Sequence, residues 1–249
     1  MNLAGKVCLV TGGTRGIGAA SAIAFAKEGA DVALVGRRID HEAEAVRDEI
    51  RKLGKRCELI QADCGKPEEA IRCAKETASR LGAVDVLVHS AGGPVNGGLL
   101  DLTPDEWQAA FDVHVHAIFH LCREVIPAMR KKKEGAIILI SSTAGIRGVI
   151  TNVAYQVAKG ALPQFARALA REFANDNIRI NCVAPGVVRT AFHATMSEEQ
   201  KRLNLEHRIP LHREGKSADV AEVILMLAKN DYMTGETVVI DGGLTMRIA

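Results

Sequence analysis

The sequence predicts an α/β protein with a doubly wound parallel sheet of seven strands and helices on both faces of the sheet. Short runs rich in β-branched residues alternate with longer amphipathic segments almost from end to end. The short runs are nearly continuous in apolar residues, as expected when helices cover both faces of a sheet. No proline-rich linker, repeat or low-complexity tract divides the 249 residues, so we expect residues 1–249 to form a single domain.

Seven apolar segments have the length and residue types of buried strands. They lack the period-two alternation of a half-exposed sheet, and small or polar residues follow them where the chain must turn. Because a helical segment follows nearly every one of them, neighbouring strands should run parallel. In chain order the predicted strands cover residues 6–11, 31–36, 57–62, 84–90, 136–141, 178–184 and 237–240.

Six longer segments carry apolar residues at the three- and four-residue spacing of a helix face. In chain order the predicted helices cover residues 16–28, 40–53, 67–81, 105–131, 151–175 and 217–229. Residues 189–214 break this rhythm, because they are polar and charged and hold only a short helix candidate at 197–205. We interpret 189–214 as a segment that covers a substrate, with an irregular connection as the alternative.

Composition and charge exclude several classes of protein. The chain is 47% hydrophobic and 25% charged, which is typical of a soluble globular protein. Its net charge of +2 gives no reason to expect nucleic acid or a membrane surface as a partner. The six cysteines show no Cys-x-x-Cys spacing, so we expect buried thiols and a cytoplasmic location. They are Cys8, Cys57, Cys64, Cys73, Cys122 and Cys182.

A glycine-rich turn, Thr-Gly-Gly-Thr-Arg-Gly-Ile-Gly at residues 11–18, joins the first predicted strand to the first predicted helix. Glycines allow the backbone to approach a pyrophosphate, and the helix N-terminus meets its charge, as in Rossmann dinucleotide sites. The second strand ends at Arg37 and Arg38 without the acidic residue that binds a ribose 2′-hydroxyl. With Arg15 these side chains would bind a 2′-phosphate, so we expect NADP(H) rather than NAD(H); solvated loop charges are the alternative.

Tyr155 and Lys159 are separated by four residues, so both side chains lie on one face of a helix. A free phenol has a pKa of about 10, and an ammonium group one turn away should lower it. Ser142 ends an apolar strand, where doubly wound sheets place their ligand crevice. This ordered set predicts a tyrosine that exchanges protons with a carbonyl or alcohol substrate.

The chain resembles a short-chain dehydrogenase/reductase, particularly the 3-oxoacyl-acyl-carrier-protein reductase-like branch. The similarity covers essentially the whole chain and rests on the glycine turn, Ser142, Tyr155 with Lys159, and the C-terminal Asp-Gly-Gly at residues 241–243. It implies that Ser142 bonds the substrate oxygen, that Tyr155 transfers the proton, and that Lys159 holds the nicotinamide ribose. It also implies a homotetramer.

The turn and the resemblance together imply a set of cofactor contacts along the chain. Asp63 would contact the adenine, and the residues after the sixth strand would surround the nicotinamide. The predicted cofactor-binding residues are Gly12, Thr14, Arg15, Gly16, Ile17, Gly18, Arg37, Arg38, Asp63, Cys64, Ser90, Ala91, Gly92, Tyr155, Lys159, Pro185, Gly186, Val188 and Thr190.

The chain departs from the family pattern at positions that usually hold asparagine. His89 and Ser90 stand in the usual Asn-Asn-Ala-Gly, and His114 stands where an asparagine completes the proton relay. We expect His114 to take over that catalytic role, with a damaged relay as the alternative, and an imidazole can also titrate within the working pH range. His114, His116 and His120 do not share one helix face, and no carboxylate or cysteine completes a ligand set, so we expect no metal.

The sequence therefore predicts an NADP(H)-dependent oxidoreductase that interconverts a ketone and a secondary alcohol, with 3-oxoacyl thioesters among its candidate substrates. Two alternatives remain open at this point. One is a sugar or polyol dehydrogenase, and the other is a nucleotide-binding regulatory protein with weakened catalysis. The substrate is a small molecule in the first two cases, and its identity does not follow from the residues.

Overall fold

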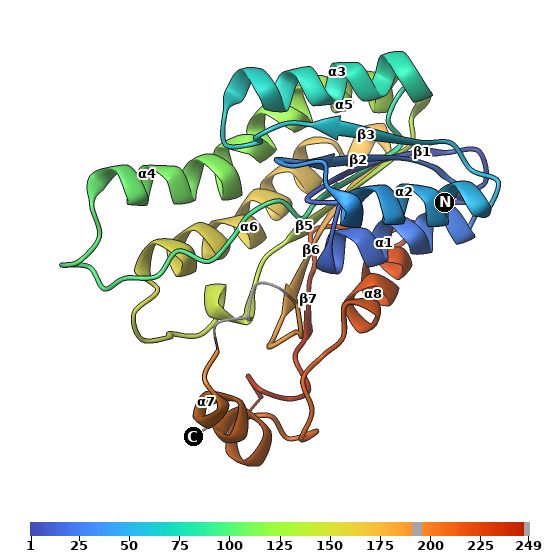
Figure 1. The fold of residues 1–249 in the computed structure, drawn as a ribbon. Coiled ribbons are helices and arrows are strands. Elements are labelled where there is room, and N and C mark those ends of the chain that lie inside the picture. Colours follow the sequence, from blue (N-terminus) through green and yellow to red (C-terminus); the bar gives the residue numbers. More distant parts are fainter. Residues whose placement is uncertain (191–195, 247–249) are drawn as a thin grey trace.

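The computed structural model, which describes residues 1–190 and 196–246, contains the predicted parallel sheet of seven strands (Figure 1). The strand order is β3-β2-β1-β4-β5-β6-β7, so the direction of winding reverses between β1 and β4. Doubly wound sheets bind ligands outside the carboxyl ends of the strands at such a reversal. The strands are β1 (Val7–Thr11), β2 (Asp31–Gly36), β3 (Cys57–Gln61), β4 (Val86–His89), β5 (Gly135–Ile140), β6 (Ile178–Pro185) and β7 (Thr237–Ile240).

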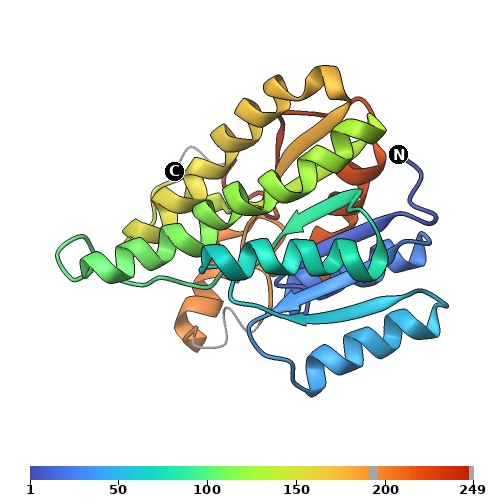
Figure 2. The ribbon, with the colours of Figure 1, turned by 90° about the horizontal axis from the view of Figure 1, so that it is seen from above.

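Helices cover both faces of the sheet, as predicted. One face packs against α1, α2 and α8, and the opposite face packs against α3, α5 and α6, which lie across it in the view from above (Figure 2). The helices are α1 (Gly16–Lys27), α2 (His41–Lys52), α3 (Pro67–Leu81), α4 (Pro104–Phe111), α5 (Ala117–Lys132), α6 (Val153–Glu172), α7 (Glu198–Leu203) and α8 (Ser217–Lys229). Among the described residues, no helix is both long enough and apolar enough to cross a bilayer.

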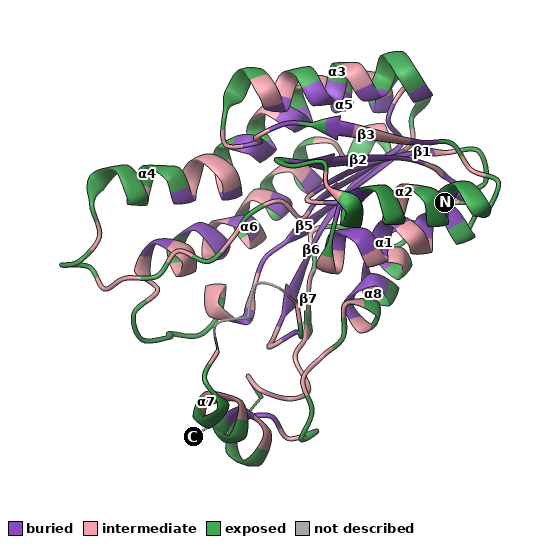
Figure 3. Ribbon diagram, viewed as in Figure 1, coloured by how far each residue is buried: buried purple, intermediate pink, exposed green. Residues whose placement is uncertain are grey.

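The hydrophobic core forms two layers, one on each side of the sheet. Successive residues of a strand point to opposite faces, so Leu9 packs towards α3 and α5 whereas Val10 packs towards α1 and α8. Both side chains are fully buried, and burial extends over the central strands (Figure 3). Burial on both faces is why the strands appear in the sequence as continuous apolar runs.

The prediction of one uninterrupted helix at residues 105–131 was wrong in one respect. The helix begins at Pro104, behind a capping box made by Thr103 and Glu106, and continues to Lys132. Between α4 and α5 it widens into a π-helical segment, η1 (Asp112–His116), in which the Ala117 N–H points to the carbonyl five residues earlier. A π segment accommodates one extra residue and is often found at functional sites.

Of the segment predicted to cover the substrate, α7 and the residues after it stand apart from the sheet, below β7 in Figure 1. The short helix predicted at 197–205 is α7, followed by a second π segment, η5 (Asn204–Arg208). The two ends of this segment are tied together, because Arg189 N–H donates to the Gly215 carbonyl and Gly215 N–H donates to the Val187 carbonyl, each at 2.9 Å. Residues 191–195 of the predicted segment lie outside the described residues.

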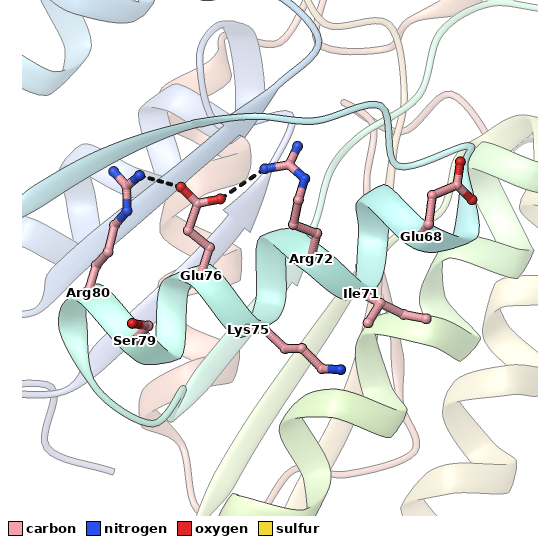
Figure 4. Close-up of a pocket in the computed structure, with 7 residues that line it drawn as sticks. All are labelled: Glu68, Ile71, Arg72, Lys75, Glu76, Ser79 and Arg80. Carbon is pink, nitrogen blue, oxygen red and sulfur yellow. Dashed lines mark hydrogen bonds and ion pairs between the residues drawn. The ribbon is translucent and has the colours of Figure 1, made fainter.

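A shallow depression of about 550 Å³ lies on the outer surface of α3 (Figure 4). All of its lining residues belong to this one helix, and Glu76 pairs with Arg72 and Arg80 on either side. Ion pairs at this spacing stabilise a solvated helix face by a few tenths of a kcal/mol. The depression is therefore part of the charged exterior of the layer and shares no residue with the crevice at the strand ends.

Candidate active site

The glycine turn closes tightly against the end of β4, next to the reversal of the sheet. A Cβ atom at Gly12, whose φ is +64°, would lie 2.7 Å from the Ser90 carbonyl oxygen, and one at Gly18 would lie 2.2 Å from the Gly12 carbonyl oxygen. Only glycine fits these two positions. No side chain of the described residues caps the N-terminus of α1 at Arg15, so its first N–H groups can meet an anionic ligand.

The walls of this crevice come from loops that are distant in the sequence. Ser90 and Ala91 follow β4, and both backbone N–H groups bond to Thr11, at 3.1 Å to its carbonyl and 3.3 Å to its hydroxyl. On the opposite wall, Thr190 packs over the start of α1, since its Cγ2 would lie 3.5 Å from a Cβ at Gly16. These contacts form a cradle of backbone and small side chains at the edge of the sheet where doubly wound folds bind their ligands.

The residues predicted around the nicotinamide lie at the end of β6. Gly186 N–H donates to the Ile240 carbonyl at 2.9 Å, and a Cβ at Gly186 would lie 2.7 Å from the Asp241 side chain. Pro185 ends β6, and Val188 is buried in the same stretch. The structure therefore brings this part of the predicted set to the same edge of the sheet as Thr190.

At the end of β3, Asp63 and Cys64 are held by the local turn. The Asp63 carboxylate accepts a hydrogen bond from Gly65 N–H at 3.0 Å, and the Asp63 backbone N–H donates to the Glu69 carboxylate at 2.7 Å. Cys64 is buried against Cys73, and their contact together with burial raises the pKa of its thiol. The Cys64 side chain is thus part of the core beside this loop.

Of the three arginines predicted to bind a 2′-phosphate, one is paired with carboxylates in the structure. Arg37 and Arg38 are exposed after β2, and no ion pair to either is found among the described residues. Arg15, in contrast, bonds to Asp40 and lies 3.6 Å from Glu42. Asp40 also caps α2 by accepting a hydrogen bond from Ala43 N–H at 3.2 Å. Sequence reasoning missed these two carboxylates, although their position just beyond Arg38 was a usable signal.

Ser142, Tyr155 and Lys159 converge at the carboxyl end of β5, as predicted from their order in the chain. Ser142 and Tyr155 are hydrogen-bonded through their side chains. The Lys159 Nζ lies 5.7 Å from the centre of the Tyr155 ring and donates to the Ile140 carbonyl at 2.7 Å. The neighbouring Ser141 hydroxyl donates to the Lys159 carbonyl at 2.7 Å, which anchors α6 to β5.

The expected direction of the Tyr155 pKa shift was wrong. Burial raises the pKa of Tyr155, and the hydrogen bond with Ser142 opposes this rise. Burial also lowers the pKa of Lys159 to about 8. The reason is that the Lys159 ammonium is directed at the Ile140 carbonyl, and loss of hydration penalises the charged form of both groups.

His114 lies in the π segment η1, beside Tyr155, with its ring edge-on to the phenol at a centroid separation of 5.5 Å. Its Nε2 bonds to the Gly93 carbonyl at 3.1 Å, whereas Nδ1 is buried and has no hydrogen-bond partner within residues 1–190 and 196–246. Burial, with a smaller contribution from Lys159, lowers the pKa of His114 to about 2. The expectation that His114 titrates within the working pH range was therefore wrong; the ring stays neutral.

The other two histidines of this region do not join the site. His116 pairs with Asp112 on the exposed side of the π segment at 2.8 Å, and His120 packs edge-on against Phe119. No group of three or more potential metal-ligating side chains occurs in residues 1–190 and 196–246. The sequence marks His89 only as a departure from the family pattern, whereas in the structure it is a second buried histidine, whose Nε2 reaches the Val113 carbonyl at 2.9 Å.

Comparison with known proteins agrees with this geometry. Residues 12–245 match the family described as enoyl-(acyl carrier protein) reductase. The chain is 35% identical over 243 residues to 3-oxoacyl-[acyl-carrier-protein] reductase of Staphylococcus epidermidis, covering 97% of this chain and 99% of that protein. It is 36% identical over 248 residues to glucose 1-dehydrogenase of Gluconobacter oxydans, covering 98% and 93% respectively. The solved structure of L-sorbose reductase from Gluconobacter frateurii, complexed with NADPH and L-sorbose, superposes with a TM-score of 0.92 at 29% identity over 100% of both chains.

These relatives are reductases and dehydrogenases of carbonyl and alcohol groups, and they match nearly the full length of the chain. The protein is accordingly an oxidoreductase that acts on CH–OH and C=O groups, rather than the regulatory nucleotide-binding protein considered as an alternative. Its seven-stranded sheet, glycine turn and Ser142–Tyr155–Lys159 group agree with the match over residues 12–245. The chain therefore belongs to the short-chain dehydrogenase/reductase family.

Proposed function

We propose that this protein is an NADP(H)-dependent oxidoreductase that interconverts a ketone and a secondary alcohol with Tyr155 as the proton donor and acceptor. The observation that carries the proposal is the hydrogen-bonded pair of Ser142 and Tyr155, with buried Lys159 one helical turn away. This group lies at the same edge of the sheet as the cradle formed by the glycine turn. A hydroxyl pair beside a dinucleotide crevice is suited to hold a carbonyl oxygen.

A bound nicotinamide supplies or accepts the hydride in this reaction. The Ser142 hydroxyl donates a hydrogen bond to the substrate oxygen and fixes its position. Tyr155 gives its phenolic proton to that oxygen in the direction of reduction, and its raised pKa keeps it protonated until the oxygen becomes basic. Lys159, whose pKa is about 8, is mostly cationic at neutral pH and stabilises the charge left on Tyr155.

The same crevice supports the choice of cofactor. Residues 12–18, the loop after β4 and residues 185–190 would hold the pyrophosphate and the nicotinamide half, and Asp63 the adenine. Arg37 and Arg38 would bind the 2′-phosphate of NADP(H), with Arg15 joining them once it leaves Asp40. The sorbose reductase structure, which contains NADPH, favours the same cofactor here.

We assign His114 to the proton relay that the family usually builds with asparagine. Because the Gly93 carbonyl can only accept a hydrogen bond, Nε2 must carry the proton, which leaves Nδ1 as an acceptor. This buried acceptor has no partner among the described residues, and the ring that carries it lies 5.5 Å from the Tyr155 ring, centroid to centroid. A water molecule placed there could pass a proton towards Lys159 and Tyr155.

An apolar rim favours an apolar ketone or 3-oxoacyl thioester over a sugar as the substrate. One part of the rim follows β4 and the other follows Ser142, and a hydrogen bond of 3.0 Å from Gly97 N–H to the Thr151 carbonyl joins them. Five large apolar side chains project from these loops into solvent, where an acyl chain could cover them. The rim consists of Leu99, Leu100, Ile146, Val149 and Ile150.

Three further features complete the proposal. Residues 1–249 act as one domain, and residues 189–214, whose ends are joined at Gly215, cover the bound substrate. The protein works as a homotetramer, for which the exposed Phe119 and Val157 on α5 and α6 are suitable contact residues. It works in the cytoplasm, where its six buried cysteines stay reduced.

The test uses purified protein, NADPH or NADH, and a panel of acetoacetyl thioester, longer 3-oxoacyl thioesters, simple ketones and sugars, with loss of the reduced nicotinamide as the signal.

Tyr155→Phe should lower turnover by about three orders of magnitude or more, because the proton donor is lost, while NADPH binding changes little. Loss of NADPH binding together with turnover would contradict the role of Tyr155. Preference for sugars over all acyl substrates would contradict the role of the rim.

A further inference from the structure

A chain of hydrogen bonds passes through His89 and joins the glycine turn to the π segment. Ala91 N–H donates to the Thr11 hydroxyl at 3.3 Å, and that hydroxyl lies 2.9 Å from His89 Nδ1. On the far side of the ring, Nε2 lies 2.9 Å from the Val113 carbonyl. Because a carbonyl only accepts, Nε2 carries the proton, and Nδ1 must then accept the proton of Thr11.

His89 cannot easily change this arrangement. The side chain is buried, and burial together with Lys159 lowers its pKa to about 4, so the ring is neutral at ordinary pH. A neutral ring with an acceptor bond on one nitrogen and a donor bond on the other has one fixed tautomer. The bonds therefore all run in one direction, from the loop after β4 to the carbonyl of Val113.

The carbonyl that His89 binds belongs to the residue immediately before His114. In a regular α-helix the Ala117 N–H would point to this carbonyl, but in η1 it points to the Asp112 carbonyl instead. The His89 side chain thus donates a hydrogen bond to the Val113 carbonyl in place of the Ala117 N–H, which bonds elsewhere. A bond from a neighbouring strand to this position favours the π turn over a regular one.

The His114 ring also has little room against the loop after β4. A Cβ at Gly92 would lie 2.0 Å from His114 Cε1, so the ring packs directly on the backbone of the loop after β4. Its Nε2 is bonded to Gly93, one residue further along that loop. A change in the π segment would therefore move the ring relative to both Gly92 and Tyr155.

We propose that His89 is a positioning residue, whose bond to the Val113 carbonyl sets the π segment and so holds the His114 ring beside Tyr155. This inference rests on the proposed relay role of His114, and it assigns to His89 an effect on turnover without contact to substrate. A glutamine at position 89 can place its amide nitrogen where Nε2 lies and keep the bond to Val113. An asparagine is shorter and can bond the Thr11 hydroxyl but not the Val113 carbonyl. The glutamine and asparagine variants therefore differ in whether the bond to Val113 is kept.

The experiment compares His89→Gln with His89→Asn, each in the natural chain and in a His114→Ala background. His89→Asn should lower kcat by about tenfold while the Kd for NADPH changes less than about twofold, and His89→Gln should recover most of kcat. In the His114→Ala background His89→Asn should cost no further turnover, because the residue through which it acts is gone. If His89→Asn does not fold, His89→Met supplies a chain of similar size without a donor.

A second readout does not depend on activity. In protein labelled with ¹⁵N-histidine, NMR should show both buried rings as neutral Nε2–H tautomers, and the His114 signals should shift in His89→Asn but hardly in His89→Gln. Unmoved His114 signals in His89→Asn, equal loss of kcat in both amide variants, or an undiminished loss in the His114→Ala background would each overturn the proposal. Normal turnover of His114→Ala alone would instead contradict the relay role of His114, while the NMR comparison would still decide whether His89 positions the ring.

Discussion

Burial determines the electrostatics of the individual residues in this site. Lys159, His89 and His114 are buried and Tyr155 is half-buried, and in each case loss of hydration is the largest cause of the pKa shift. The neutral form is favoured in every one of them, which is the direction that desolvation always produces. Spacing along a helix can show that two groups are neighbours, but their protonation depends on what covers them.

The two buried histidines should make the stability of the protein depend on pH. Their pKa values are about 4 for His89 and about 2 for His114, both below the ordinary value of 6.5. Below about pH 6.5 the unfolded chain takes up protons that the folded protein refuses, so the free energy of unfolding should fall as pH falls, by about 1.4 kcal/mol per pH unit for each histidine. Above this range neither histidine should contribute a slope.

Urea unfolding at several pH values between about pH 7 and pH 5 measures this dependence. The natural protein and His114→Gln provide the comparison, because glutamine is neutral throughout. The change in the free energy of unfolding with pH should be smaller in the variant by the contribution of one histidine, about 1.4 kcal/mol per pH unit. Equal slopes in the two proteins would mean that His114 takes up a proton in the folded state, so that burial does not lower its pKa.

At the scale of elements, the site is assembled where loops after parallel strands meet the starts of helices. The short helix η2 (Thr143–Gly145) turns the chain from β5 towards α6, and it touches α6 closely. A Cβ at Gly145 would lie 2.7 Å from the Lys159 carbonyl carbon and 2.8 Å from the Gly160 nitrogen. Because these are backbone atoms, α6 would have to move to admit a methyl group.

Gly145→Ala should therefore separate Ser142 from Tyr155 and lower kcat by about tenfold or more, since small misplacements of reacting groups are costly. Gly148→Ala is the matched control, because no atom of the described residues lies within 4 Å of a Cβ at Gly148 and the residue is in the same loop. Steady-state kinetics on both variants, with circular dichroism to confirm folding, makes the comparison. A normal kcat in Gly145→Ala would show that the contact of η2 with α6 does not set the catalytic geometry.

At the scale of the whole molecule, the sequence predicts those features that leave a local or periodic mark. Apolar runs such as the one in β5 reveal strands buried on both faces, and the turn at 11–18 and the spacing of Tyr155 and Lys159 are local patterns. The π segment was not predictable in this way, because its bond to His89 joins residues 24 positions apart. The bond between Arg15 and Asp40 spans 25 positions, so the place of Asp40 just beyond Arg38 could suggest an acidic neighbour but not this particular partner.

Binding of the cofactor should stabilise the entire molecule, because the crevice takes residues from the ends of β1, β2, β3, β4 and β6. A ligand that binds only the folded state at 100 times its Kd adds about 2.7 kcal/mol to the free energy of unfolding. Because Arg37 and Arg38 would bind the 2′-phosphate, NADPH should raise the melting temperature more than NADH at equal concentration.

Replacing Arg37 and Arg38 by alanine should reduce the effect of NADPH to that of NADH, because the 2′-phosphate loses its partners. Asp40→Asn is the complementary variant, since it releases Arg15 from a carboxylate and should increase the NADPH shift. Thermal unfolding of the three proteins with each cofactor decides the matter: a difference between NADPH and NADH that survives the double alanine variant would mean that the phosphate is bound elsewhere.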